Sequence, residues 1–149
     1  MPKGSQQLTN ARKKEIIDAC ASLYKTMSFK EITMKDIATA TSFTRTSIYN
    51  YFQTKEEIFL ALLQREYELW NEKLRQLRAK HENLSATEFA DKLARSLEER
   101  ENLLKLMSMN HYDMEENSRF ERLVEFKSVY GQSLKEVKNC LDQFFPKMS

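Results

Sequence analysis

A short segment in the N-terminal half is rich in side chains that donate hydrogen bonds. Between residues 44 and 55 it carries hydroxyls, one guanidinium and one ammonium, and the apolar residues Ile48 and Phe52 recur among them at helical spacing. A short helix that buries one edge and presents donors on the other suits a groove lined with phosphates. We therefore interpret this segment as a DNA-recognition helix. Its donors are Thr44, Arg45, Thr46, Ser47, Tyr49, Tyr51 and Lys55.

These donors differ in what they can recognise. Hydroxyls and an ammonium hold a protein on phosphates without reading the sequence, whereas the guanidinium of Arg45 can pair with both major-groove acceptors of guanine. The methyl group of Thr46 can contact thymine. The residues alone leave two alternatives open: Tyr49 and Tyr51 as core aromatics, and Arg45 as a solvated surface charge.

The charge distribution also favours a nucleic-acid partner. The 149 residues carry a net charge of +2, yet residues 1–55 contain nine Lys and Arg against four Asp and Glu. The remainder is mildly acidic. A basic front end on an acidic body is expected for a nucleic-acid module that is attached to a second region.

Long helices must position this segment, so the expected fold class is all-α. Only two glycines and two prolines occur, too few for the closely spaced turns of a sheet protein. The first helix is predicted over residues 10–27, after a flexible arm, and the fourth is predicted to end near Lys80. Polar residues are expected to cap the later helices at their N-termini. These caps are Thr33, Thr44, Thr54, Ser85 and Ser118.

The elements predict two domains. Residues 1–53 would form the arm and a three-helix helix-turn-helix domain of homeodomain-like type, and residues 54–149 a C-terminal helical bundle, to which the family resemblance given below assigns effector binding and dimerisation. Within the bundle, residues 101–112 are apolar on more than one side and are expected to be buried. Gly131 lies inside the last predicted helix, which implies a close neighbour or a bend there.

Several classes of function are not expected. Cys20 and Cys140 are far apart and are predicted to be reduced thiols, and neither His81 nor His111 has metal-ligand spacing. No nucleophile set and no glycine-rich phosphate loop occurs. No signal segment and no apolar run of bilayer length is present. We therefore expect a cytoplasmic protein without enzyme activity, cofactor, metal or membrane partner.

The N-terminal part of the chain resembles the tetracycline-repressor (TetR) family of bacterial transcription regulators. The resemblance is carried by Phe29–Thr33 leading into Ile37-Ala38, then by Thr44–Phe52 and Lys55–Phe59. It implies that Arg45 and Thr46 meet base edges. It also implies that phosphates are contacted by Thr33, Thr44, Ser47, Tyr49, Tyr51 and Lys55.

Two features depart from the family pattern. Ser42 stands where the family usually has a turn glycine, and Phe43 where a small aliphatic residue is common. Family members are also usually longer at the C-terminus, where two final helices pair with a second subunit. We therefore expect either a differently formed dimer or a shortened family member that lacks the usual interface.

The resemblance further implies a ligand-responsive regulator, a repressor that binds double-stranded DNA at a palindromic operator as a homodimer. A small-molecule effector pocket of the family type would be lined by aromatic and methionine side chains, although residues of these types at helical spacing serve equally well as plain core. The candidates are Tyr67, Trp70, Phe89, Met107, Met109, Tyr112, Phe126 and Tyr130. The alternatives are a helical protein-interaction module, a sensor or enzyme built on the bundle, and a shortened regulator without independent DNA binding.

Overall fold

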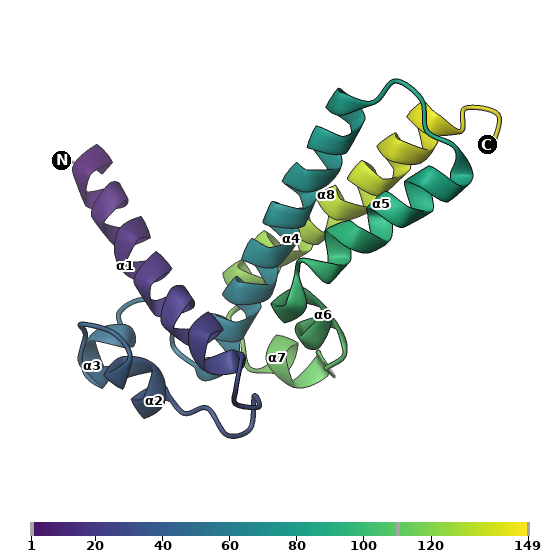
Figure 1. The fold of residues 1–149 in the computed structure, drawn as a ribbon. Helices are drawn as coiled ribbons and strands as arrows, with labels where there is room; N and C mark the ends of the chain where they lie inside the picture. The colour runs from purple at the N-terminus through teal and green to yellow at the C-terminus, as the bar shows by residue number, and fades with distance from the viewer. Residues whose placement is uncertain (1, 110, 149) are drawn as a thin grey trace. The chain divides into compact units, whose positions relative to one another are not determined.

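The computed structural model describes residues 2–109 and 111–148, with the side chains of residues 2 and 3 left aside. Within these ranges the chain forms helices and no strand, which confirms the all-α prediction (Figure 1). The helices are α1 (Pro2–Tyr24), α2 (Met34–Thr39), α3 (Arg45–Ile48), α4 (Lys55–Lys80), α5 (Ala86–Glu98), α6 (Glu101–Met107), α7 (Tyr112–Glu116) and α8 (Phe120–Phe144).

Three of the predicted caps are confirmed. The side chains of Thr33 and Ser85 each accept a bond from the backbone N–H three residues on, and the acidic residue there bonds back to the cap's own N–H. Thr44 accepts from the backbone N–H of Ser47. These bonds satisfy N–H groups that the first turn of a helix leaves without partners, so α2, α3 and α5 begin where local chemistry places them.

The remaining two predicted caps differ from the first three, because the cap at Thr54 forms without its reciprocal bond and the cap at Ser118 does not form. The hydroxyl oxygen of Thr54 accepts from the backbone N–H of Glu57. The carboxylate of Glu57 does not bond back to the backbone N–H of Thr54, because it accepts instead from the backbone N–H of Gln53. The hydroxyl of Ser118 donates to the carbonyl of Met114, at 2.6 Å, so it closes the end of α7 and does not open α8. A cap pattern that spans three residues cannot show whether its side chain will bond to the helix before it or to the helix after it.

Two further predictions are wrong in part. Residues 2–9, expected to be a flexible arm, belong to α1, where Gln6 and Asn10 bond side chain to side chain, one turn apart, at 3.0 Å. Residues 101–109 and 111–112 contain α6 and the first residue of α7, and they are not uniformly buried. Leu103 and Leu106 are buried, whereas Leu104 and Met107 are exposed, since a short helix on a core hides only one face.

The chain divides into two compact units, each of which has its own core. Unit 1 comprises residues 1–62 and 110–123, and unit 2 comprises residues 63–109 and 124–149, so α4 and α8 each contribute to both. The predicted division of function, with DNA binding in residues 1–53 and the bundle in residues 54–149, stays a prediction. No helix in the described ranges is long and apolar enough to cross a membrane.

In unit 1 the core is built where α1, α2 and the start of α4 contribute apolar faces. Ile16, Cys20 and Tyr24 of α1 are buried at the helical spacing that the sequence shows. The ring of Tyr24 meets that of Phe59 edge to face with centroids 5.2 Å apart, and Phe29 meets Phe59 at 4.8 Å. Helix α2 packs against both α1 and α3, which fixes α3 on this core.

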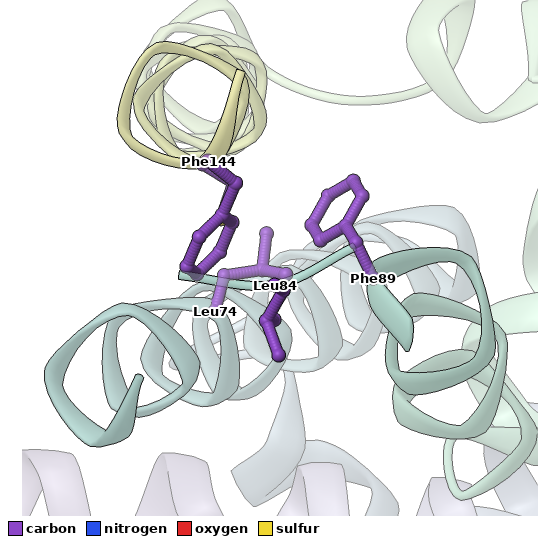
Figure 2. Packing of buried hydrophobic residues seen from close by; sticks show 5 residues of the cluster. Leu74, Leu84, Phe89 and Phe144 are labelled. Atoms are coloured by element: carbon purple, nitrogen blue, oxygen red, sulfur yellow. The ribbon is translucent and has the colours of Figure 1, made fainter. Parts of the chain in front are cut away.

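In unit 2 the core joins α4, α5 and α8. Leu74, Leu84, Phe89 and Phe144 point toward one another from these elements and the loop before α5 (Figure 2). Cys140 completes the buried cluster. Apart from its chain neighbours and the backbone of its own helix, Gly131 has no described atom within 4 Å of the position that a side chain would take, so no close neighbour in the described chain requires the glycine.

Candidate nucleic-acid interface

Helix α3 is held by two buried side chains. Ile48 is fully buried and Phe52, just beyond the helix, is 2% exposed, so the apolar edge faces the core of unit 1 as predicted. Thr44 caps the helix at its start, and its hydroxyl also lies 3.0 Å from that of Ser47. The opposite edge is therefore free to face a partner.

The turn before α3 forms without glycine. The backbone N–H of Ser42 donates to a carboxylate oxygen of Glu15 at 2.7 Å, and its hydroxyl bonds to the same atom at 2.9 Å. Thr41 accepts from the backbone N–H of Phe43. No residue in the described ranges has a positive φ, so a serine meets no steric penalty here. Glu15 of α1 provides the contact that fixes this turn.

Most of the predicted DNA-contacting side chains are accessible. Arg45 and Thr46 are exposed, and Tyr49 is 43% exposed, which excludes it from the core. Thr33 and Thr44 are exposed cap residues whose oxygens accept internal bonds. The hydroxyl proton of Thr33 remains available, whereas the hydroxyl of Thr44 also bonds to that of Ser47, with either as the donor. Ser47 and Tyr51 are half-buried. All of them belong to unit 1.

Lys55 makes two contacts within the chain that its sequence position does not suggest. Its ammonium donates to the backbone carbonyl of Phe29 at 2.7 Å and lies 4.2 Å from the centre of the Phe29 ring. An ammonium carries three donors, so a phosphate contact can use those that remain. Lys55 therefore both anchors the loop after α1 and offers charge at the start of α4.

Tyr51 has a neighbour that the sequence analysis missed. A guanidinium N–H of Arg12, on α1, donates to the phenolic oxygen of Tyr51 at 3.0 Å. Because the oxygen accepts this bond, the hydroxyl proton stays free to donate to a phosphate. The two residues are 39 positions apart, and no pattern in the sequence joins them.

A second missed residue, Arg119, forms an ion pair beneath the recognition segment. Its guanidinium donates to both carboxylate oxygens of Glu57, each at 2.9 Å, and its backbone N–H donates to one of them at 2.8 Å. It also reaches the backbone carbonyl of Tyr51 at 3.4 Å. Nearby, the hydroxyl of Thr54 donates to the carbonyl of Asn117. The residues just before α8 thus hold the junction between the recognition segment and α4.

The electrostatics of this pair follow from its burial. Glu57 is 1% exposed, and burial by itself raises the pKa of its carboxyl group. The hydrogen bonds from Arg119 and from the backbone of Gln53, together with the charge of Arg119, outweigh that effect and hold the pKa below its ordinary value. The hydrogen bond to Glu57 correspondingly raises the pKa of Arg119. Both groups are therefore charged at neutral pH.

The predicted effector residues do not converge on one place. Tyr67, Phe126 and Tyr130 form an aromatic cluster in unit 2, with Tyr67 and Tyr130 edge to face at 5.4 Å. Phe89 packs instead on Phe144 and Phe145 in the core. Trp70 packs against the same core cluster as Phe89 and donates to Ser96 at 2.9 Å. Met109 is half-buried, and Met107 and Tyr112 are 46% and 64% exposed.

Comparisons with known proteins place this geometry in a class. Residues 16–62 match the family described as "Bacterial regulatory proteins, tetR family", and residues 64–149 match "Tetracyclin repressor-like, C-terminal domain". The capped helix α3 lies on a three-helix core and is followed by these C-terminal helices. This architecture is that of a helix-turn-helix transcription regulator. The chain belongs to the TetR family.

Two relatives agree with this assignment. The HTH-type transcriptional regulator YfiR of Bacillus subtilis (strain 168) is 32% identical over 63 residues, which is 42% of this chain and 31% of YfiR. The matched part thus spans less than a third of that relative. The fatty acid degradation regulator FadR from Bacillus halodurans has a similar fold, with a TM-score of 0.64 over 93% of this chain and 73% of FadR. At 18% identity, that similarity shows the fold alone.

Proposed function

We propose that the protein is a ligand-responsive repressor that binds a palindromic operator as a homodimer in the bacterial cytoplasm. The observation that carries the proposal is the division of the recognition segment into a buried edge, with Ile48 and Phe52, and an exposed edge of donors. An exposed row of donors on a rigid support is what phosphate and base recognition require.

The proposed roles follow from the chemistry of each side chain. Arg45 would pair with guanine in the major groove, and Thr46 would contact a neighbouring base. The surrounding hydroxyls, with Lys55, would bind phosphates and set the orientation of α3. In a symmetric dimer the two α3 helices would enter successive major grooves about 34–36 Å apart, or a multiple of this.

Release of DNA would require an effector that binds two arrangements of the dimer unequally. We place the effector in unit 2 and propose that it changes the tilt of α4, and with it the separation of the recognition helices. The Arg119–Glu57 ion pair supports this role, because it fixes the first turn of α4 to the carbonyl of Tyr51. A movement of α4 would therefore act directly on the recognition segment.

The test is selection of bound duplexes from a random pool, using the full chain. We expect enrichment of a two-fold symmetric sequence, with affinity that falls steeply as salt rises. Recovery of a single half-site would contradict the homodimer. Absence of any salt-dependent duplex binding would overturn the proposal and leave a helical protein-interaction module. Light scattering on the same sample reports the oligomeric state.

A further inference from the structure

A groove in unit 2 combines an apolar floor with basic walls. It lies between the C-terminal half of α4 and α5, has a volume of about 190 Å³ and opens to solvent. Leu74 and Leu77 of α4 form its floor, and Leu74 is fully buried. None of the eight aromatic and methionine residues considered above lines it.

The walls of the groove carry more positive than negative charge. Lys73, Lys80, Lys92, Arg95 and His81 line it, whereas Glu99 is the one acidic side chain in the lining. Glu99 is paired with Lys73 at 3.4 Å, and Arg95 is paired with Asp91 at 2.9 Å. Lys80 and Lys92 have no ion pair in the described ranges. Glu88 of α5 lies near Lys92 and His81, and its pKa is lowered by its hydrogen bonds with Ser85 and, to a smaller extent, by the charges of these two residues.

The order of the basic side chains along the groove follows from the direction of its two helices. The ion pair from Arg100 to Glu66 and the bond from Trp70 to Ser96 show that α4 and α5 run antiparallel. Lys80 and His81, at and just beyond the end of α4, therefore lie toward the start of α5, whereas Lys92 lies in the middle of α5. The neutral Lys73–Glu99 pair lies at the opposite end. The end of the groove away from that pair thus offers the ammonium of Lys80, with Lys92 farther along α5 and the carboxylate of Glu88 nearby, and the floor is apolar.

We propose that this groove is the effector site and that it takes a small amphipathic anion, with its carboxylate or phosphate at Lys80 and Lys92 and its apolar body over Leu74 and Leu77. The inference rests on the proposed ligand-responsive function. Opposite charge at one end and apolar contact along the floor would orient the ligand in a single direction. The volume is below the roughly 300–1,000 Å³ of pockets for drug-sized ligands, so the apolar body is short.

The chain contains a built-in reporter. Its single tryptophan, Trp70, donates its indole N–H to the hydroxyl of Ser96, which lines the groove. Occupancy of the groove should therefore change the indole fluorescence. We would titrate the full chain with octanoate, octyl phosphate, octanol and octyltrimethylammonium, and confirm the binding by calorimetry. These probes share the apolar body and differ in the head group.

We expect both anions to bind, octanol to bind about tenfold more weakly and the cation to show no binding. Whichever of octanoate and octyl phosphate binds more tightly identifies the head group. Equal binding of the cation, or no heat and no fluorescence change with either anion, would overturn the proposal.

Charge-removing variants locate the site. Lys80→Gln and Lys92→Gln should each weaken octanoate binding about threefold, and the double variant about tenfold. The matched control is Lys138→Gln on α8, which removes the same charge in unit 2 but does not line the groove. An equal loss in the control would mean non-specific attraction and would overturn the site.

Binding of the probe and binding of DNA are measured separately, so the two proposals fail separately. If the wild-type chain binds operator and octanoate but octanoate does not weaken operator binding, the groove is a ligand site but not the effector site. If the chain binds octanoate and no duplex, the DNA-binding proposal fails and the ligand site stands.

Discussion

The exposed edge of α3 and the ion pair beneath it use the same kinds of side chain in opposite ways. Arg45 is exposed and has no ion pair in the described ranges, whereas Arg119 satisfies a carboxylate that is 1% exposed. An exposed donor without an internal partner can bind another molecule. A donor that is used in internal hydrogen bonds stabilises the fold instead. This difference supports the proposal that Arg45 reads DNA and that Arg119 positions the recognition segment.

Loss of the buried pair should have the largest effect. Arg119→Ala would leave the carboxylate of Glu57 buried without compensation, and we expect a loss of about 3 kcal/mol in the free energy of unfolding, measured with urea. The control is the double variant Glu57→Gln with Arg119→Met, which should recover part of this loss because no buried charge remains. A loss below about 0.5 kcal/mol would show that the pair is not structural.

Removal of the exposed arginine should change binding and leave stability unaffected. Arg45→Ala is expected to cost roughly 1–3 kcal/mol in operator binding and to relax base preference at one operator position. Urea unfolding should match that of the wild type, because Arg45 is exposed. If Arg45→Ala weakened all sequences equally, its role would be phosphate contact and not base reading.

Acid should act on the buried pair and not on the exposed edge. The pKa of Glu57 in the folded chain lies below its ordinary value of 4.5, so its contribution to stability is present at neutral pH. That contribution is lost as the pH falls below 4.5 through the lower folded pKa. The difference in unfolding free energy between wild type and Glu57→Gln should therefore shrink on acidification. A constant difference down to about pH 3 would contradict the assignment.

The smallest effects should come from phosphate contacts. Lys55→Ala and Arg12→Ala should each weaken binding to all duplexes alike and flatten the dependence of log affinity on log salt by about one unit. Lys14→Ala is the matched control, since Lys14 also lies on α1 but is paired with Asp18 at 2.7 Å. If Arg12→Ala behaved like Lys14→Ala, the contact between Arg12 and Tyr51 would be structural only.

Much of the recognition element was predictable because its signals are local. The caps at Thr33, Thr44 and Ser85 act over three residues, and the burial of Ile48 and Phe52 follows from helical spacing. The predicted cap at the start of α4 is incomplete because a distant residue competes for its carboxylate. The carboxylate of Glu57 pairs with Arg119, 62 residues away, and does not bond back to the cap at Thr54. No local pattern reports that partner.

The sequence by itself determined the all-helical class, the donor-rich segment and most helix starts, because backbone hydrogen bonding and apolar periodicity depend on residues within a turn or two. Tertiary structure alone decided that Arg12 meets Tyr51, that Arg119 neutralises Glu57, and that a groove with a basic end lies between α4 and α5. These contacts join residues far apart in the chain, and only the packing of helices sets which side chains come within hydrogen-bonding distance.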